Sequence, residues 1–321
     1  MAKADYLIVT GLCRKVPEFL ERFEISTRTM DHRPQFVFST WHDEVKNNPE
    51  EIKSLEAAGF EIFAQPEPQV IMTGHMLHQL QALLGALQFC PEGAMVARSR
   101  TDYFQPKFLE SDDLDPTKLT IDQAISGVPF AINDMNFAST CAKLKALCAV
   151  PILYDACYCD LQTEQMIWGH QYEAATPWIH SVLKRIRFED YRINYKSRDL
   201  LPSLFAHAPY LRALEEYFVV LLEHFAFIRG ATRSELGFAS EQSLEDAITT
   251  DGLLRVTYHN VVGMNKITHL SDCEILLEKV RATLGDSERA LTEENPALIS
   301  SVHTDPALKG WVGWRTRLRM K

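Results

Sequence analysis

Short apolar segments alternate with helical segments through the first hundred residues, and this alternation restricts the fold more than any other feature. Apolar runs typical of buried strands occupy residues 5–10, 35–39, 60–64 and 94–97. Apolar spacing and helix boundary signals indicate helices over residues 16–30, 49–58 and 74–89. Strands that alternate with helices in this way form a parallel sheet with helices on both faces. We therefore predict an α/β fold with right-handed crossovers.

The fourth apolar run ends in an unusual group of polar side chains. Residues 94–97 lead directly into Arg98, Arg100, Asp102 and Tyr103. Ligands of open α/β sheets bind outside the carboxyl ends of the strands. Two arginines and one aspartate at such an end indicate a site for phosphate groups, together with a metal ion or a sugar hydroxyl. A strand followed by a surface turn with an Arg–Asp ion pair is the alternative interpretation.

Two earlier strands also end in small or polar residues. The first ends in Thr10 and Gly11, and the second ends in Ser39, Thr40 and Trp41. Glycine lets a ligand approach the backbone closely, and the tryptophan either stacks on a base or sugar or covers the edge of the sheet. No glycine-rich phosphate loop or dinucleotide fingerprint follows the first strand. This disfavours NAD-dependent enzymes and NTPases and leaves nucleotide-sugar enzymes, which need no such fingerprint.

The overall composition narrows the class of protein and its partners. A chain of 321 residues, 46% hydrophobic and 24% charged, is long enough for one large domain or two. Its formal net charge of −10 argues against nucleic acid as the main partner. We expect neither a transmembrane helix nor a signal peptide. The seven cysteines, an odd number without a regular framework, are typical of reduced thiols, so we expect a cytoplasmic protein.

Several of these segments occur in the order found in one family of enzymes. The Ser39-Thr40-Trp41 strand end, the helix Gln79–Leu87 and the strand end Arg98–Tyr103 follow one another. This arrangement resembles the WavE-type lipopolysaccharide-synthesis glycosyltransferases, in which a Ser-Thr-Trp strand end, an Asn/Gln-rich helix and a Lys-x-Arg-x-Asp strand end occur in the same order. This chain has Ala97-Arg98 where Leu-Lys is usual, and the asparagine-rich start of the helix is replaced by Gly74-His75 and His78.

Two further segments carry the same resemblance. Residues 130–134, followed by Asn136-Phe137-Ala138, are similar to the Asp-x-x-Phe-Gly/Ala segment of that family. Residues 163–168 are similar to its Glu-Gln-Tyr-x-Trp segment. The resemblance extends over roughly residues 5–175, which is about half of the chain.

The resemblance implies a GT-A-like fold in two parts. Residues 1–175 would form a nucleotide-sugar-binding α/β domain, with a mainly parallel sheet flanked by helices. Residues 176–321 would form a mostly helical acceptor-side or packing region that ends in a basic, aromatic tail. The implied activity is the transfer of a sugar from a nucleotide-sugar donor to a bacterial surface glycan, such as lipopolysaccharide or capsule. Such enzymes usually bind Mg²⁺ or Mn²⁺ between the donor phosphates.

The resemblance also suggests which residues contact the donor and the metal ion. Asp102 is the candidate metal ligand, although GT-A enzymes usually carry two carboxylates here and this chain offers one. A site without a metal ion, in which Arg98 and Arg100 neutralise the phosphates, is an equally compatible arrangement. The expected donor contacts are Thr10, Gly11, Ser39, Thr40, Trp41, Arg98, Arg100 and Asp102.

An inverting transfer also requires a base that accepts the proton of the acceptor hydroxyl. Glu164 and Asp134 are the candidate catalytic residues, and the family match favours Glu164 as the base and Asp134 as a donor or acceptor contact. His170 is a third candidate. Each carboxylate has a structural alternative: Asp134 as the N-cap of a helix that begins near Asn136, and Glu164 as a favourable charge in the first turn of a helix.

The second half of the chain carries fewer chemical signals. A basic amphipathic helix over residues 178–187 is either a solvated face or a contact for an anionic acceptor. A long apolar helix over residues 208–228 packs on the sheet domain or at a homodimer interface. We also expect a strand over residues 252–258 and a helix from Ser271 to about Leu284.

The C-terminal tail combines aromatic and basic residues. Residues 309–321 contain two tryptophans, three arginines, two lysines and no acidic residue. Tryptophan favours the bilayer interface, and basic residues are attracted to anionic lipids. This composition predicts peripheral contact with the inner face of the membrane, whereas Trp311 and Trp314 packed onto the core are the alternative.

Two other functions are compatible with the same motifs. A sugar-nucleotide nucleotidyltransferase would need a glycine-rich signature followed by a lysine near the N-terminus, and residues 11–15 are a poor version of it. A catalytically inactive, glycosyltransferase-like binding protein is the alternative that is not an enzyme. The sequence leaves open the donor, the acceptor, the linkage, the stereochemistry and the oligomeric state.

Overall fold

The computed structural model describes residues 2–28, 30–69, 75–125, 130, 132–149, 167–168, 208–229 and 266–294. Five of the sequence-based predictions lie outside these residues. They are the base Glu164, the third candidate His170, the basic helix over 178–187, the strand over 252–258 and the tail over 309–321.

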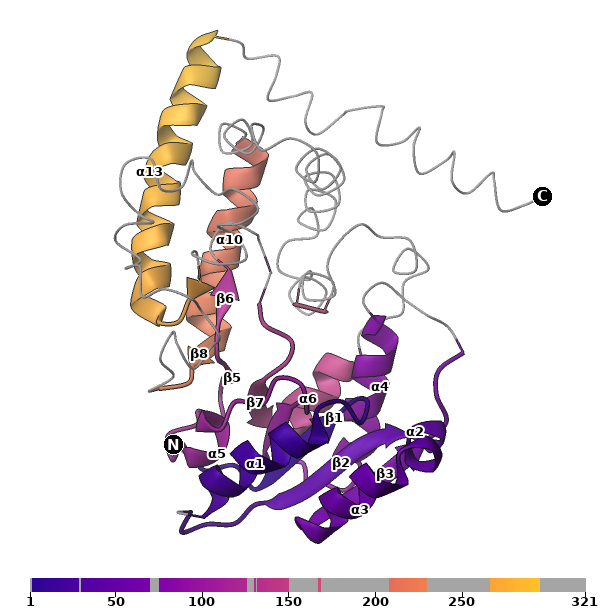
Figure 1. Ribbon diagram of the computed structural model, residues 1–321. Coiled ribbons are helices and arrows are strands. Elements are labelled where there is room, and N and C mark those ends of the chain that lie inside the picture. Colours follow the sequence, from indigo (N-terminus) through magenta and orange to yellow (C-terminus); the bar gives the residue numbers. More distant parts are fainter. Residues whose placement is uncertain are drawn as a thin grey trace, which may run out of the picture.

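The described residues form a seven-stranded sheet with the strand order β3-β2-β1-β4-β7-β5-β8 (Figure 1). The strands are β1 Tyr6–Thr10, β2 Gln35–Trp41, β3 Phe60–Gln65, β4 Met95–Ser99, β5 Leu119–Ile121, β7 Phe137–Thr140 and β8 Phe225–Phe227. β7 is antiparallel to both of its neighbours, and the other strand pairs in the sheet are parallel. A second sheet pairs β6 Ala124–Ile125 with β9 Lys266–Ile267. The predicted α/β class and the mainly parallel sheet are confirmed.

Helices cover both faces of the seven-stranded sheet, because side chains along each strand alternate between two hydrophobic clusters. In β1, Ile8 belongs to one cluster, and Leu7 and Val9 belong to the other. The Ile8 face is covered by α4 Met76–Leu87 and α6 Cys141–Cys148. The same hydrophobic cluster continues through α10 Ala208–His224, which contacts β8, to α13 Leu270–Glu294, which packs on α10. The opposite face is covered by α1 Val16–Thr27, α3 Pro49–Ala57 and α5 Lys107–Glu110, and the short helix α2 His42–Asn47 follows β2.

The chain reverses its direction across the sheet between β1 and β4. β2 and β3 follow β1 on one side, whereas β4 lies on the other side of β1. The connections that leave the carboxyl ends of β1 and β4 therefore separate at this point, which is where open α/β sheets form their ligand crevice. α4 begins at the same edge of the sheet and packs across β1 and β2.

The two C-terminal helices have bounds that differ from those predicted from the sequence. The helix predicted to continue to residue 228 stops at His224, and Phe225–Phe227 form β8. These three residues satisfy the open edge of β5 with a parallel ladder, so tertiary pairing overrides the helical spacing. The last helix begins at Leu270, one residue before the predicted cap Ser271, and it continues past the predicted end to Glu294. The single glycine in this helix, Gly285, lowers the stability of the helix by too little to end it.

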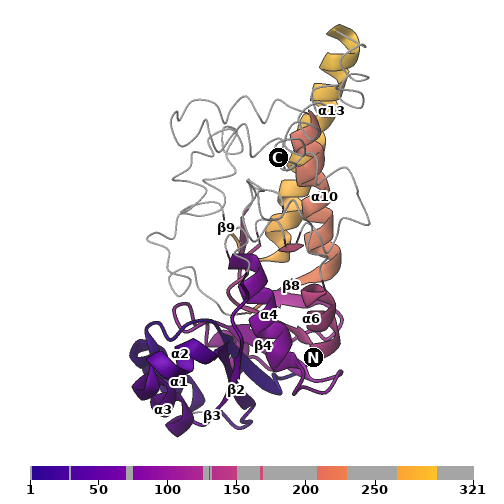
Figure 2. The same cartoon turned by 90° about the vertical axis from the view of Figure 1, so that its right-hand side faces the viewer.

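In two perpendicular views, α10 and α13 lie side by side and extend beyond the sheet (Figure 2). The long apolar helix thus packs mainly on α13, and it contacts the seven-stranded sheet at β8. Among the described residues, none of the helices has the length and apolarity required to cross a bilayer.

Gly85 of α4 packs closely on β3, and we predict that a methyl group at this position destabilises the fold. A Cβ on Gly85 would clash with Cε1 of Phe63 and lie 2.8 Å from Oε1 of Gln65. Gly85→Ala should therefore lower the free energy of unfolding by about 1–3 kcal/mol through overpacking, although alanine is the better helix former. Urea denaturation followed by circular dichroism measures the change.

Gly285 of α13 supplies a matched control, because a Cβ at this helical position meets no heavy atom within 4 Å. Gly285→Ala should raise the free energy of unfolding by up to about 1 kcal/mol through helix propensity alone. A stabilising effect of the same size at Gly85 would contradict the close packing of α4 on β3.

Candidate functional site

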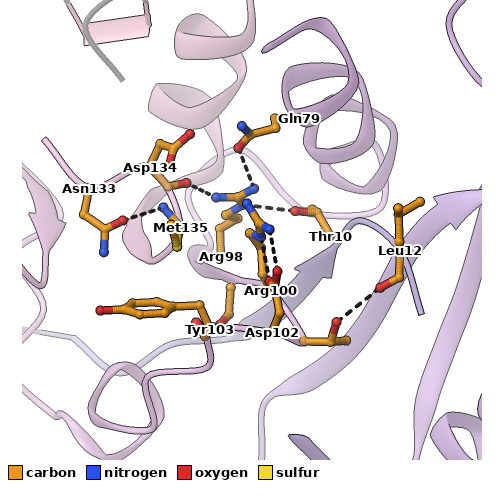
Figure 3. A network of polar contacts seen from close by, with 12 residues as sticks. Thr10, Leu12, Gln79, Arg98, Arg100, Asp102, Tyr103, Asn133, Asp134 and Met135 are labelled. Atoms are coloured by element: carbon orange, nitrogen blue, oxygen red, sulfur yellow. Dashed lines mark hydrogen bonds and ion pairs between the residues drawn. The ribbon is translucent and has the colours of Figure 1, made fainter. Parts of the chain in front are cut away.

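A pocket lies at the carboxyl edge of the sheet, where the strand order reverses between β1 and β4. Its wall combines the loop after β1, the end of β2, the start of α4 and the residues at and after the end of β4. Figure 3 shows Thr10, Leu12, Gln79, Arg98, Arg100 and Asp102 from this wall. The lining residues are Thr10, Gly11, Leu12, Arg14, Trp41, Glu67, His75, His78, Gln79, Ala82, Arg98, Arg100, Thr101 and Asp102. The pocket therefore occupies the position at which open α/β sheets bind their ligands.

Most of the residues expected to contact a donor lie in this wall. Six of the eight, Thr10, Gly11, Trp41, Arg98, Arg100 and Asp102, line the pocket. The other two, Ser39 and Thr40, are fully buried and are absent from the lining. The Ser39 hydroxyl donates a hydrogen bond of 2.6 Å to the carbonyl of Ala82, so it fastens β2 to α4. The buried Thr40 hydroxyl has no hydrogen-bond partner within the described part of the chain.

Arg98 extends from β4 into the base of the pocket, and its hydrogen-bond acceptors among the described residues are neutral. Its Nε donates to Oγ1 of Thr10 at 3.0 Å, and its Nη2 donates to Oε1 of Gln79 at 3.2 Å. Its Nη1 donates to the backbone carbonyl of Asp134, and the guanidinium carbon lies 5.4 Å from the centre of the Phe137 ring. These bonds use three of the five N–H donors of the guanidinium.

The charge of Arg98 is buried, and the strongest opposite charge that acts on it is that of Asp134. The side chain is 3% exposed, and burial lowers the pKa of Arg98 to about 10, although the nearby charge of Asp134 acts in the opposite direction. Arg98 is still protonated near neutral pH at this pKa. Among the residues that the structure describes, no carboxylate oxygen lies within ion-pair distance of Arg98. A buried charge without a counterion is costly, so an anionic ligand is the partner that this arrangement favours.

Arg100 and Asp102 form the ion pair that was the alternative interpretation of this strand end. Arg100 Nε donates to Asp102 Oδ1 at 2.8 Å, and Arg100 Nη2 donates to Asp102 Oδ2 at 2.6 Å. Partial burial acts to raise the pKa of the Asp102 carboxyl, but the hydrogen bonds and charge of Arg100 outweigh it, so the pKa lies below its usual value. Asp102 is therefore ionised, and it fixes the orientation of the Arg100 guanidinium.

The lining is more cationic than the chain as a whole. Arg14, Arg98 and Arg100 contribute three positive charges, whereas Glu67 and Asp102 contribute two negative charges. The histidines aside, this wall carries a net positive charge in a chain whose formal net charge is −10. Such a local field attracts anions even when the whole protein is acidic.

Trp41 and His78 form the other wall of the pocket. Trp41 is 3% exposed, and its ring meets the His78 ring edge to face, with a centroid separation of 5.6 Å. His78 Nε2 lies 3.4 Å from Oε1 of Glu67. Burial lowers the pKa of His78, although Glu67 acts to raise it, so the ring is neutral near pH 7. Trp41 is therefore held by its contact with His78 at the side of the pocket.

Asp134 lies beside Arg98 but does not cap a helix. Residues 137–140 form β7, which fills the space between β4 and β5, and the next helix begins only at Cys141. The interpretation of Asp134 as an N-cap is therefore wrong. The buried residue presents its backbone carbonyl to the guanidinium of Arg98 (Figure 3).

Asp122 is a buried carboxyl group near Arg98 that the sequence patterns did not reveal. It follows β5 directly, is 1% exposed and accepts hydrogen bonds from Asn133 Nδ2 at 2.7 Å and Asn136 Nδ2 at 3.3 Å. Burial raises the pKa of Asp122 to about 7, although the hydrogen bonds from both asparagines act to lower it. A polar residue after an apolar strand was the available signal, but β5 has only three residues and does not stand out in the sequence.

The described residues do not fit a divalent metal ion at Asp102. Both carboxylate oxygens of Asp102 are engaged by Arg100, and the three arginines of the lining would repel a cation. Magnesium and manganese sites in proteins are built from carboxylate and other oxygen ligands. Within the described ranges, no three His, Cys, Asp or Glu residues are grouped so that they could hold a metal ion.

The charge state of Asp122 predicts a pH dependence of stability. An unfolded aspartate titrates near pH 4, whereas in the fold the pKa of Asp122 is about 7. The folded protein therefore binds more protons between these values, so the stabilising contribution is fully present below about pH 4 and is lost as the pH rises to about 7. Asp122→Asn should flatten this part of the profile, measured as Tm from about pH 4 to about pH 8.

Asp115→Asn is the control for this experiment. Asp115 precedes β5, and the hydrogen bond from the Thr117 side chain lowers the pKa of its carboxyl. Because the pKa of Asp115 lies below this interval, its replacement should change the slope little. A slope in Asp122→Asn equal to that of the parent protein would show that Asp122 does not titrate in this range.

Comparison with known proteins adds no family assignment. The chain matches none of the protein-family models, none of the curated proteins and none of the solved structures with which it was compared. The geometry of the pocket and the motifs of the sequence are therefore the two sources of evidence on function.

Proposed function

We propose that this chain is a glycosyltransferase that moves a sugar from a nucleotide-sugar donor to a bacterial surface glycan, such as lipopolysaccharide or capsule. The observation that carries the proposal is the arginine-lined pocket at the point where the strand order reverses. The order of the sequence motifs, which resembles WavE-type enzymes, supports the same conclusion. The pocket is suited to the diphosphate of the donor, because two neighbouring guanidiniums, Arg98 and Arg100, enter it from one strand end.

In this proposal, Arg98 and Arg100 neutralise the charge that develops on the leaving diphosphate. Fixed cations at the position where charge develops stabilise a transition state without having to reorganise. The planar guanidinium matches a phosphate group with two parallel hydrogen bonds. Asp102 contributes by orienting Arg100, and the proposal requires no metal ion at this carboxylate. Gly11, whose φ is 116°, lets the ligand approach the backbone after β1.

The proton of the acceptor hydroxyl requires a separate group. We assign the base to Glu164, on the strength of the sequence motif, and a donor or acceptor contact to Asp134. Glu164→Gln retains the shape of the side chain and removes its basicity, so turnover should fall by roughly 10²-fold or more while donor affinity changes little. Initial rates at saturating donor, together with calorimetric donor affinities, test this assignment. Unchanged turnover with weaker donor binding would make Glu164 a binding residue instead.

The diphosphate site makes a second prediction, which concerns nucleotide binding. UDP, GDP or CMP should raise the Tm of the protein, because a ligand that binds only the native state stabilises it. Arg100→Gln should weaken binding of the active nucleotide by about tenfold or more, since a hydrogen bond to a charged group contributes about 1.5–3 kcal/mol. Arg281→Gln is the matched control, because Arg281 forms an exposed ion pair with Glu215 at 2.9 Å, away from the pocket.

The same assay, repeated with Mn²⁺ and with a chelator, tests the role assigned to Asp102. If Asp102 only orients Arg100, Asp102→Asn should weaken nucleotide binding by the same factor in both conditions. A loss that occurs only with Mn²⁺ would instead identify Asp102 as a metal ligand. No Tm shift with any nucleotide would count against both the glycosyltransferase and the alternative nucleotidyltransferase, and binding without sugar transfer would favour an inactive binding protein.

A further inference from the structure

Asp122 is a buried carboxylate to which the proposed chemistry assigns no part. Its acceptors are filled by neutral donors, namely the side-chain amides of Asn133 and Asn136 and the backbone N–H groups of Asp122 itself and Gln123. Burying a carboxylate is costly unless it is paired or strongly hydrogen-bonded. A fold that keeps such a group therefore gains something from the contacts that it makes.

These contacts hold both ends of one turn. The turn comprises residues 133–136 and connects to β7. Asn133 is bound at its side chain by Asp122 and donates its backbone N–H to the carbonyl of Gln123 at 3.1 Å. Within the turn, Oδ1 of Asn133 accepts the backbone N–H of Met135 at 3.0 Å. At the other end, Asn136 is fully buried and donates to the second oxygen of Asp122.

Asn136 also connects Asp122 to the strand that carries Arg98. The Ser99 hydroxyl of β4 donates to Oδ1 of Asn136 at 2.6 Å. The register explains this contact, because Phe137 of β7 pairs with Arg98 on one side and with Ile121 on the other. Asn136, one residue earlier, therefore lies between Ser99 at the end of β4 and Asp122 at the end of β5.

The middle of the turn receives the guanidinium. Arg98 Nη1 donates to the carbonyl of Asp134, which lies between the two asparagines that Asp122 holds. The guanidinium also rests against the ring of Phe137, the first residue of β7. A shift of the turn would thus move two of the groups that fix Arg98, whereas Thr10 and Gln79 hold it from β1 and α4.

We propose that Asp122 is a positioning residue that locks the 133–136 turn in place, so that the Asp134 carbonyl and the Phe137 ring direct Arg98 toward an anion in the pocket. Because the turn offers Arg98 a neutral carbonyl, the guanidinium is oriented while its charge stays available. The identity of that anion as a diphosphate rests on the proposed function. The link from Asp122 to Arg98 does not rest on the proposed function, since it requires only the contacts of the protein without ligand.

The link is tested first without any ligand. With arginine labelled by ¹⁵N, the exchange rate of the Arg98 Nε–H with water reports how firmly the guanidinium is held. Asp122→Asn preserves the shape of the side chain but replaces one of its two acceptor oxygens with an NH₂ group. This group would face the amide donor of Asn133 or Asn136, so one hydrogen bond is lost and the turn should loosen. The exchange rate at fixed pH should rise by about tenfold, the equivalent of one lost hydrogen bond. Asp115→Asn should leave the rate unchanged.

Asn133→Ala is the second variant, and it is the milder one because Asn133 is only partly buried. It removes the 2.7 Å bond to Asp122 and leaves Asn136 in place, so it should raise the Arg98 exchange rate in the same direction even if Asp122→Asn folds poorly. An exchange rate that is unchanged in every folded variant of the pair would overturn the proposal.

A double-mutant cycle then tests whether the link matters for binding. Inorganic pyrophosphate serves as the probe, with affinities from calorimetry. Asp122→Asn should weaken binding by about three- to tenfold in the parent protein and by less than about twofold in the Arg98→Lys background, because contacting residues are coupled in such cycles. Equal effects in both backgrounds would show that Asp122 does not act through Arg98 and would overturn the proposal.

The outcomes separate the two proposals. If pyrophosphate binds and Asp122→Asn has a smaller effect in the Arg98→Lys background, but no nucleotide binds, the proposed function is rejected and Asp122 remains a positioning residue. If nucleotide binds and sugar is transferred, but Asp122→Asn has the same effect on pyrophosphate binding in both backgrounds, the proposed function stands and the positioning role of Asp122 is rejected. If the parent protein binds no pyrophosphate, Arg98 is not an anion ligand and the proposal fails in that part, whatever the exchange rate shows.

Discussion

The guanidinium of Arg98 is the contact at which four separate parts of the chain meet. Thr10 comes from β1, Gln79 from α4, the Asp134 carbonyl from the turn before β7, and Arg98 itself from β4. Thr10 lies 88 residues before Arg98 in the sequence, and Asp134 lies 36 residues after it. One long side chain, buried in their midst, receives a hydrogen-bond acceptor from each of the other three parts, as buried polar groups require.

The three acceptors that Arg98 has among the described residues are all neutral. A carboxylate partner would cancel much of the charge and leave little for a ligand, as the neighbouring pair of Arg100 and Asp102 illustrates. Carbonyl, amide and hydroxyl oxygens satisfy the geometry and leave the charge in place. The buried carboxyl group of Asp122 contacts this corner only indirectly, through two asparagines. Burying the Arg98 cation costs free energy, and an anionic ligand in the pocket would offset that cost.

The first part of the fold could be predicted from the sequence, whereas much of the second part could not. The apolar runs before Gly11, Trp41 and Arg98 are long enough to identify strands by themselves. β5 and β8 have three residues each, and β8 continues the apolar spacing of a helix, so only pairing with a distant strand defines them. The arginines were found because they follow a clear strand. Asp122 was missed because its partners lie 11 and 14 residues away, at no regular spacing.

The direction of β7 explains why the site has its neutral support. Parallel strands bring their carboxyl ends to one edge of a sheet, and the loops that leave this edge form the ligand crevice. An antiparallel strand begins at that same edge, so the segment before β7 arrives beside the ends of β4 and β5. If β7 were parallel, the 133–136 turn would lie at the opposite edge, and Arg98 would lose the Asp134 carbonyl. The one antiparallel strand of the described sheet therefore adds an acceptor where the parallel strands supply the cations.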